Sequence, residues 1–211
     1  VESADDVEGQ CAYLSVDGSV VAIVYFDESI REEAMPLMSY LSGKGIQVFI
    51  LSGDRQSSVD RIASELGVDP NNAFGDLSVN GKADIVKKLQ NGGEKKVAFV
   101  GDGINDVLSL AQSDVGFGFA VESGSSAAVE ASDVALVGND LRKVYYALEI
   151  GTRTMANTRQ NLALAFTYNA VAMPLTALGF VPPTESSLIH SSSTLAVILN
   201  SMRLRSLRDI K

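Results

Sequence analysis

The sequence predicts a doubly wound α/β domain over residues 1–150, followed by a transmembrane α-helical hairpin over residues 151–211. Three observations lead to this prediction. Short apolar runs alternate with helix-like segments in the first part of the chain, as expected of a sheet covered by helices. Clusters of Gly, Asp and Asn directly follow two of these runs. Farther along the chain, residues 160–184 contain no charged side chain.

The predicted strands are short runs rich in Val, Ile and Phe. Residues 20–26 follow an Asp17-Gly18 turn, which predicts a hairpin with residues 11–16. The later runs are continuously apolar rather than alternating, and this suits parallel strands that are covered on both faces. These later strands are predicted at residues 46–51, 97–100, 115–119 and 134–137.

Helix-like segments separate these strands. One of them, residues 57–66, is followed by Gly67, the residue type that most often ends a helix. The predicted helices of the α/β domain are residues 32–42, 57–66, 82–90 and 105–112.

The uncharged run 160–184 is long enough to span a membrane, which requires about 20 apolar residues. A buried core helix is the alternative, but 25 uncharged positions exceed the usual length of one. Pro174 would kink this helix, as membrane helices tolerate. The second uncharged run, 186–202, is more polar, and we interpret it as the return helix with its polar face turned inward.

Basic residues flank both runs and predict the orientation of the hairpin. They precede the first run and follow the second, which places both chain ends and the α/β domain on the cytoplasmic or stromal side. Residues 179–185, with Pro182 and Pro183, would then form the turn on the far side. The flanking basic residues are Arg153, Arg159, Arg203, Arg205, Arg208 and Lys211.

The composition excludes some classes of function. The net charge is −9 and no basic stripe is present, which argues against a nucleic-acid partner. The single cysteine, Cys11, excludes an internal disulfide framework and a cysteine-rich zinc site. The chain starts at Val1 without an initiator Met or a signal segment, so we expect it to be a fragment or a processed product.

Two polar clusters lie where predicted strands end. Ser52-Gly53-Asp54 follows residues 46–51, and Gly101-Asp102-Gly103-Ile104-Asn105-Asp106 follows residues 97–100. Ligands of open α/β sheets bind beyond the carboxyl ends of the strands. Carboxylates grouped there suit Mg²⁺ and a phosphoryl group, and the ammonium of Lys82 would meet the same oxygens. Each cluster alone is a common turn, but the two together in this order predict a phosphoryl site.

These motifs resemble a known family. Ser52-Gly53-Asp54, Lys82 and the segment 101–106 are similar to the phosphorylation domain of P-type ATPases, a branch of the haloacid-dehalogenase-like (Rossmann-like) fold. Segments of the two uncharged runs resemble the last two membrane helices of heavy-metal pumps, and copper(I) transporters most of all. Residues 26–34 and 49–54 resemble the plastid copper pumps of plants, which points to a chloroplast membrane. The similarity extends over about residues 18–207.

The resemblance implies a role for each matching residue. Asp102, with Asp106, would hold Mg²⁺, and Ser52 and Lys82 would contact the phosphoryl group of an aspartyl-phosphate formed from ATP. Positioning and electrostatics of this kind carry most of phosphoryl transfer. The residues implied for catalysis are Ser52, Gly53, Asp54, Lys82, Asn105 and Asp106.

In the second part of the chain, the resemblance implies a path for the transported ion and a metallochaperone as a partner. His190 stands where copper pumps have Met. An imidazole also suits Zn, Co and Ni, so a cobalt/zinc-type pump remains an alternative to copper(I). A lone His in an apolar run is more often a packing residue, although in a membrane helix it points to function. The residues implied for the ion path are Tyr168, Asn169, His190, Ser193 and Thr194.

Several family segments are absent from this sequence: the Asp-Lys-Thr-Gly segment with the phosphorylated aspartate, the nucleotide-binding domain, the Thr-Gly-Glu loop and the Cys-Pro-Cys site. We therefore expect the fragment alone to be inactive. Two further hypotheses stay open. One is a stand-alone phosphatase with Asp27 as its nucleophile, although Ser29 stands where a second acid is usual. The other is a truncated, non-catalytic relative that assembles with an intact pump.

Overall fold

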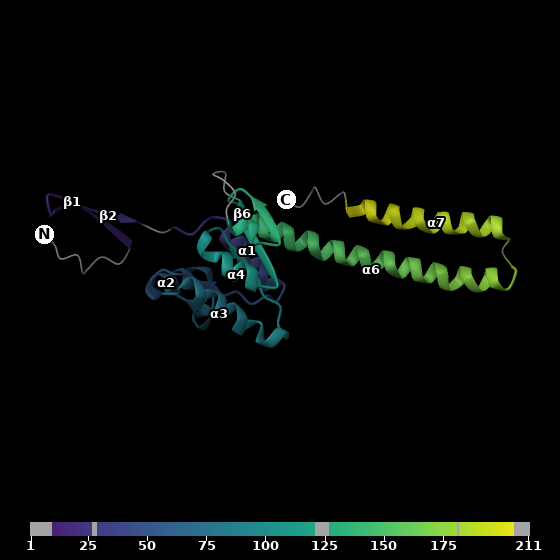
Figure 1. The fold of residues 1–211 in the computed structure, drawn as a ribbon, viewed down its shortest axis with the longest axis horizontal. Helices are drawn as coiled ribbons and strands as arrows, with labels where there is room; N and C mark the ends of the chain where they lie inside the picture. Colours follow the sequence, from purple (N-terminus) through teal and green to yellow (C-terminus); the bar gives the residue numbers. More distant parts are fainter. Residues whose placement is uncertain (1–9, 27–28, 121–126, 181, 205–211) are drawn as a thin grey trace. The chain divides into compact units, whose positions relative to one another are not determined.

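The computed structural model describes residues 10–26, 29–120, 127–180 and 182–204. The chain divides into two compact units, Val1–Arg142 and Lys143–Lys211, whose elements are drawn in Figure 1. The strands are β1 (Gln10–Val16), β2 (Ser19–Phe26), β3 (Ile50–Leu51), β4 (Ala73–Phe74), β5 (Ala98–Gly101), β6 (Val115–Ala120) and β7 (Val134–Val137). The helices are α1 (Ala34–Gly43), α2 (Gln56–Leu66), α3 (Val79–Leu89), α4 (Val107–Gln112), α5 (Ala127–Glu130), α6 (Arg142–Ala177) and α7 (Pro183–Met202). Short 3₁₀ turns lie at η2 (Pro70–Asn72), η3 (Asn91–Gly93) and η4 (Ile104–Asp106).

The strands form one antiparallel hairpin and two small parallel sheets. β1 pairs with β2 from Gln10 opposite Phe26 to Val16 opposite Ser19, as the Asp17-Gly18 turn predicts. β3 pairs with β4 in parallel, and β5, β6 and β7 form a second parallel sheet in that order. Parallel pairing therefore agrees with the continuous apolar character of these runs.

The sheet predicted as one layer differs from the observed arrangement in two ways. The predicted strand 46–51 forms a ladder only at Ile50–Leu51, because its partner β4 is itself only Ala73–Phe74. β4 was not predicted, since two residues are too few to give a pattern. Within the described residues, the β3–β4 and β5–β6–β7 sheets share no ladder.

The helices agree with their predicted positions within a few residues. α2 ends at Gly67, which is left-handed with φ 69°, as predicted. α3 starts at Val79, earlier than predicted, because the Ser78 hydroxyl caps it by accepting a hydrogen bond from the Gly81 N–H at 3.1 Å. The predicted helix 105–112 is split into η4 and α4, which meet at Asp106 with φ −101° and ψ −7°.

The apolar core holds the helices on these sheets. Val59 and Ala63 of α2 pack with Val68 and Ala73 in one buried cluster, on which Ile50 of β3 also packs. Around the second sheet the buried apolar side chains are Leu110, Phe117, Phe119, Ala128 and Leu136. Both parallel sheets are thus anchored, and the carboxyl ends of β3 and β5 lead into the two loops that carry the predicted site residues.

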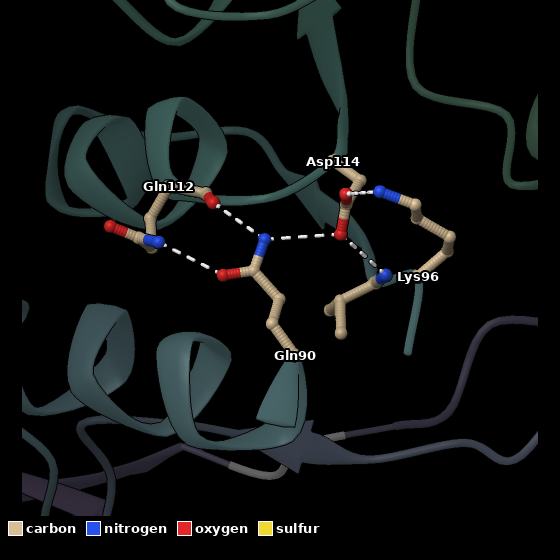
Figure 2. A network of polar contacts seen from close by, with 5 residues as sticks. Gln90, Lys96, Gln112 and Asp114 are labelled. Carbon is tan, nitrogen blue, oxygen red and sulfur yellow. Dashed lines mark hydrogen bonds and ion pairs between the residues drawn. The ribbon is translucent and has the colours of Figure 1, made fainter. Parts of the chain in front are cut away.

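A polar network closes the C-terminal end of α3 (Figure 2). Gln90 donates to the Gln112 carbonyl and to Asp114, both at 3.0 Å, and the Gln112 amide donates back to Gln90 at 2.9 Å. Asp114 also accepts from Lys96 at 2.7 Å and from the Val97 N–H at 3.0 Å. The network ties the end of α3 to α4 and to the starts of β5 and β6.

The second unit is a helical hairpin of α6 and α7. Asn157 and Tyr168 of α6 contact Asn200 and Ser192 of α7 respectively, so the two helices run antiparallel. α6 is longer than the predicted run 160–184: it begins at Arg142, ends at Ala177 and contains Pro174. A helical hairpin is therefore confirmed. Within the described ranges, however, no helix combines the length and the apolar character that a membrane span requires.

Candidate functional site

The loop after β5 is shaped by a close approach at Gly101. Gly101 is buried, and a Cβ atom there would lie 2.6 Å from the Cβ of Asp106. Only glycine allows this contact, which brings the carboxylate of Asp106 back against the end of the strand. Asp102 and Asn105 are exposed on the same loop. The loop therefore presents one exposed carboxylate, Asp102, and one partly buried carboxylate, Asp106, four positions later.

Lys82 meets this loop from α3. Its Nζ donates to Oδ1 of Asp106 at 2.9 Å, and the two side chains are only 14% and 13% exposed. A partly buried ion pair of this kind keeps both charged groups in place, because either one alone would be costly to bury. The structure thus brings together two of the predicted catalytic residues, which lie 24 positions apart in the sequence.

The loop after β3 is tightly hydrogen-bonded. The Ser52 hydroxyl donates to Oδ2 of Asp54 at 2.5 Å and accepts from the Asp54 N–H at 3.2 Å. The Ser52 backbone continues the pairing with the chain after β4, since its N–H donates to Phe74 at 2.9 Å and its carbonyl accepts from Leu77 at 3.0 Å. Gly53 is exposed at the tip of the loop. A hydroxyl and a backbone turn are therefore held at the carboxyl end of β3.

The helix α3 contributes to both loops, although it follows β4 in the chain. Its start follows the Leu77 segment that binds Ser52, and its second turn carries Lys82, which binds Asp106. Within the described residues, no three His, Cys, Asp or Glu side chains lie close enough together to hold a metal ion. The oxygen donors Asp102 and Asp106 suit a hard cation such as Mg²⁺, but further ligands would have to come from other groups.

The predicted ion-path residues lie on the hairpin. Oη of Tyr168 and Oγ of Ser192 are 2.6 Å apart across the two helices. Asn169 and Thr194 are exposed, and Ser193 is half-buried. His190 belongs to α7, but its side chain lies outside the described part of the chain, as does the whole of Asp27.

The hairpin also holds a cluster of amide side chains, on α6 and near the C-terminal end of α7, for which no role was predicted from the sequence. Asn157, 8% exposed, donates to the Asn200 carbonyl at 2.9 Å. Asn161 donates to the Asn157 amide oxygen at 2.9 Å and to Ser201 at 2.8 Å, and Asn200 donates to Asn161 at 2.9 Å. These bonds fix the register of α6 against α7. The available signal was the presence of several amides in uncharged runs.

Two residues next to the Ser52 loop were also missed. Gln56 begins α2, and Asp76 follows β4 with a positive φ of 52°. Both hydrogen-bond across the two loops. Neither residue belongs to a motif from which a chemical role could be predicted, although an aspartate next to a glycine is typical of a turn.

Comparisons with known proteins show which proteins this chain resembles. A family model described as a haloacid dehalogenase-like hydrolase matches residues 4–114. The chain is 35% identical over 192 residues to a probable copper-importing P-type ATPase of Enterococcus hirae. This match covers 91% of the present chain and 26% of the relative. The chain is 36% identical over 200 residues to the chloroplastic copper-transporting ATPase of Arabidopsis thaliana. This match covers 92% of the present chain and 21% of the relative.

A solved structure is similar over nearly the same span. A zinc-transporting PIB-type ATPase in the E2.Pi state matches 92% of this chain and 31% of its own, with a TM-score of 0.78 and 29% identity. The chain spans about a quarter of the length of the curated relatives it matches.

Proposed function

Because the chain belongs to the haloacid dehalogenase-like hydrolase family, we propose that it works as part of an ATP-driven heavy-metal transporter of the P type, with copper(I) as the transported ion. The observation that carries this proposal is the partly buried Lys82–Asp106 pair, with a contact of 2.9 Å. It lies at the carboxyl end of a parallel strand, where ligands of α/β folds bind. The 35% and 36% identities to copper transporters support the ion.

The reaction would pass through an aspartyl-phosphate. In this proposal Lys82 and the Ser52 hydroxyl contact the phosphoryl oxygens, and the Gly53 backbone lies beside them. The Ser52 hydroxyl, which donates to Asp54 at 2.5 Å in this structure, would turn its hydrogen toward the phosphoryl oxygens when the group binds, and Asn105 would donate a further hydrogen bond. These groups act by position and charge, since phosphoryl transfer requires little covalent chemistry from the protein.

The phosphorylated aspartate would come from a segment outside this chain. Among the described residues β3 pairs with β4 alone and β5 with β6 alone, so each has one unpaired edge. Val100 of β5 is 40% exposed, although its run is as apolar as a strand covered on both faces. A further parallel strand between β3 and β5 would cover both edges. The residue after that strand would then lie at the same end as Ser52 and Asp102.

Mg²⁺ and ATP are the cofactors of this proposal. Asp102 is exposed and Asp106 lies on the same loop, and their oxygen donors fit Mg²⁺ as part of its ligand set. When bound, Mg²⁺ would neutralise charge on the phosphoryl oxygens. The nucleotide would bind to a domain that is not part of this sequence.

The hairpin would lie in a lipid bilayer and line the path of the ion. Residues 160–184 are uncharged, and the basic residues at both ends would keep the α/β domain on the cytoplasmic or stromal side. A metallochaperone would deliver copper(I), and the Arabidopsis relative supports a chloroplast membrane. The ion path would use Tyr168, Asn169, His190, Ser193 and Thr194.

A zinc pump is the second candidate. The similar solved structure is a zinc-transporting ATPase, and His190 offers an imidazole rather than a thioether. Metal-stimulated ATP hydrolysis by the full-length protein in membrane vesicles tests both. Copper(I) should stimulate hydrolysis and zinc should not. Stimulation by zinc alone would favour the second candidate, and no stimulation by any metal would contradict the transporter.

A further inference from the structure

A clasp of hydrogen bonds joins the loop after β3 to the loop after β4. The amide of Gln56 spans the gap: its Oε1 accepts from the Gly75 N–H at 2.6 Å, and its Nε2 donates to the Ala73 carbonyl at 3.0 Å. The same Nε2 donates to Asp60 on the next turn of α2 at 2.8 Å. One side chain thus fixes the start of α2 to the backbone of the neighbouring loop.

Asp76 completes the clasp from the other side. Its carboxylate accepts from the Gln56 N–H at 3.2 Å, and its own N–H donates to the Asp54 carbonyl at 2.6 Å. The Gln56 N–H lies at the first turn of α2, where backbone donors have no partner within the helix. Asp76 holds this geometry with φ 52°, a region that Asn and Asp adopt more readily than other side chains.

Gly75 makes the close contact possible. A Cβ atom there would lie 2.5 Å from the Cα of Gln56 and 2.9 Å from the carbonyl oxygen of Asp54. The two loops therefore pack backbone against backbone. Any larger residue at this position would push the Ser52-Gly53-Asp54 turn away from the loop that leads into α3.

We propose that Gln56 and Asp76 are positioning residues that set where the Ser52 hydroxyl lies relative to the Lys82 ammonium. Neither would touch the phosphoryl group. They act on the Ser52–Asp54 turn, which they tie to residues 73–77, directly before the helix that carries Lys82. The inference rests on the proposed function, because it concerns how these two groups meet one phosphoryl group.

The test compares Gln56→Ala with Gln90→Ala in the full-length protein. Gln90 is a matched control. It lies at the C-terminal end of α3, whereas Lys82 lies near the N-terminal end. Like Gln56, it is half-buried and forms hydrogen bonds through both the oxygen and the nitrogen of its amide. The measurements are the rate of phosphoenzyme formation at saturating ATP and Mg²⁺, the KM for ATP, and the Tm. We expect Gln56→Ala to slow formation about 10- to 100-fold with KM unchanged, since small displacements of reacting groups have effects of this size.

Gln90→Ala should lower the Tm by a similar amount but leave the formation rate within about twofold of the wild type. A second pair of variants keeps the test valid if Gln56→Ala does not fold. Asp76→Asn keeps an oxygen acceptor and tolerates a positive φ, so it should form phosphoenzyme at nearly the wild-type rate. Asp76→Ala should slow formation about tenfold.

Equal rates for Gln56→Ala and Gln90→Ala, or for Asp76→Asn and Asp76→Ala, would overturn the positioning role while leaving the proposed function intact. A wild-type protein that forms no phosphoenzyme from ATP would overturn the proposed function and this inference together.

Discussion

The two ends of α3 use similar side chains in different ways. At the C-terminal end, Asp114 accepts hydrogen bonds from Lys96, the Val97 N–H and Gln90 (Figure 2). At the N-terminal end, Asp106 accepts from Lys82, and Asp102, four positions earlier on the same loop, is exposed. Both ends pair an aspartate with a lysine. Only the first surrounds its aspartate with donors from the protein.

This difference separates a structural network from a candidate site. The Lys96 ammonium, helped by the Val97 N–H and Gln90, holds the pKa of Asp114 well below its usual range. A carboxylate with this many protein donors has little capacity left for a ligand. Asp102 is exposed and keeps that capacity, and a Cβ atom at Gly103 would meet no atom closer than 3.9 Å, so that part of the loop is open to a ligand. We therefore place the proposed phosphoryl site at the N-terminal end of α3, where fewer protein donors surround the carboxylates.

The largest effect is expected from removing the cation at the N-terminal end. Lys82→Met would leave the carboxylate of Asp106 partly buried without its ammonium partner. We expect ATP hydrolysis by the full-length protein to fall at least about 100-fold and the free energy of unfolding to fall by about 3 kcal/mol. Steady-state kinetics and urea denaturation measure the two effects. Unchanged hydrolysis would remove Lys82 from the proposed site.

The next prediction concerns overpacking at the end of β5, where the backbone of Gly101 lies against Asp106. Gly101→Ala would place a Cβ 2.6 Å from that of Asp106, and we expect a loss of about 2 kcal/mol in the free energy of unfolding. Gly103→Ala is the control, because the nearest atom to its Cβ would be 3.9 Å away. Urea denaturation of both variants should separate them, and equal stabilities would show that the close approach has no energetic consequence.

Breaking the network at the C-terminal end should affect stability without affecting chemistry. Gln90→Ala should cost about 1 kcal/mol of unfolding free energy, the usual value of lost internal hydrogen bonds. Metal-stimulated hydrolysis by the full-length protein should remain within about twofold of the wild type. A large loss of hydrolysis at full stability would mean that both ends of α3 take part in the reaction.

The lowered pKa of Asp114 also predicts an acid response. The contribution of Asp114 to stability is present above its unfolded-state pKa, close to the ordinary aspartate pKa of 3.8, and is lost as the pH falls below that value toward the folded-state pKa. Asp114→Asn should therefore flatten the fall in stability below about pH 4. Urea midpoints at a series of acidic pH values measure this. An unaltered pH profile would contradict the role of the network.

The smallest effect is expected from the buried hydroxyl of Ser109, on the helix α4 that follows the Asp102–Asp106 loop. Ser109 of α4 is fully buried, and its hydroxyl has no hydrogen-bond partner within the described residues. Ser109→Ala removes this unsatisfied group and should raise the unfolding free energy by about 1 kcal/mol. Thermal unfolding of the variant gives the answer, and a loss of stability would mean that the hydroxyl has a partner after all.

The sequence could predict the elements whose signals are local. β6, β7 and α2 follow from apolar runs and from Gly67, and the two candidate loops follow from glycine and carboxylate clusters at strand ends. β4 and the clasp of Gln56 with Asp76 could not be predicted. A two-residue strand has no periodicity, and hydrogen bonds between loops 20 residues apart depend on tertiary packing.

The most direct test of the proposed phosphoryl site is phosphoenzyme formation by the full-length protein with radiolabelled ATP, Mg²⁺ and copper(I), comparing the wild type with Asp102→Asn. We expect an acid-stable, hydroxylamine-sensitive phosphoenzyme in the wild type and none in Asp102→Asn, although that variant should keep its Tm because Asp102 is exposed. Equal labelling of the two proteins would contradict the assignment of the site to the N-terminal end of α3.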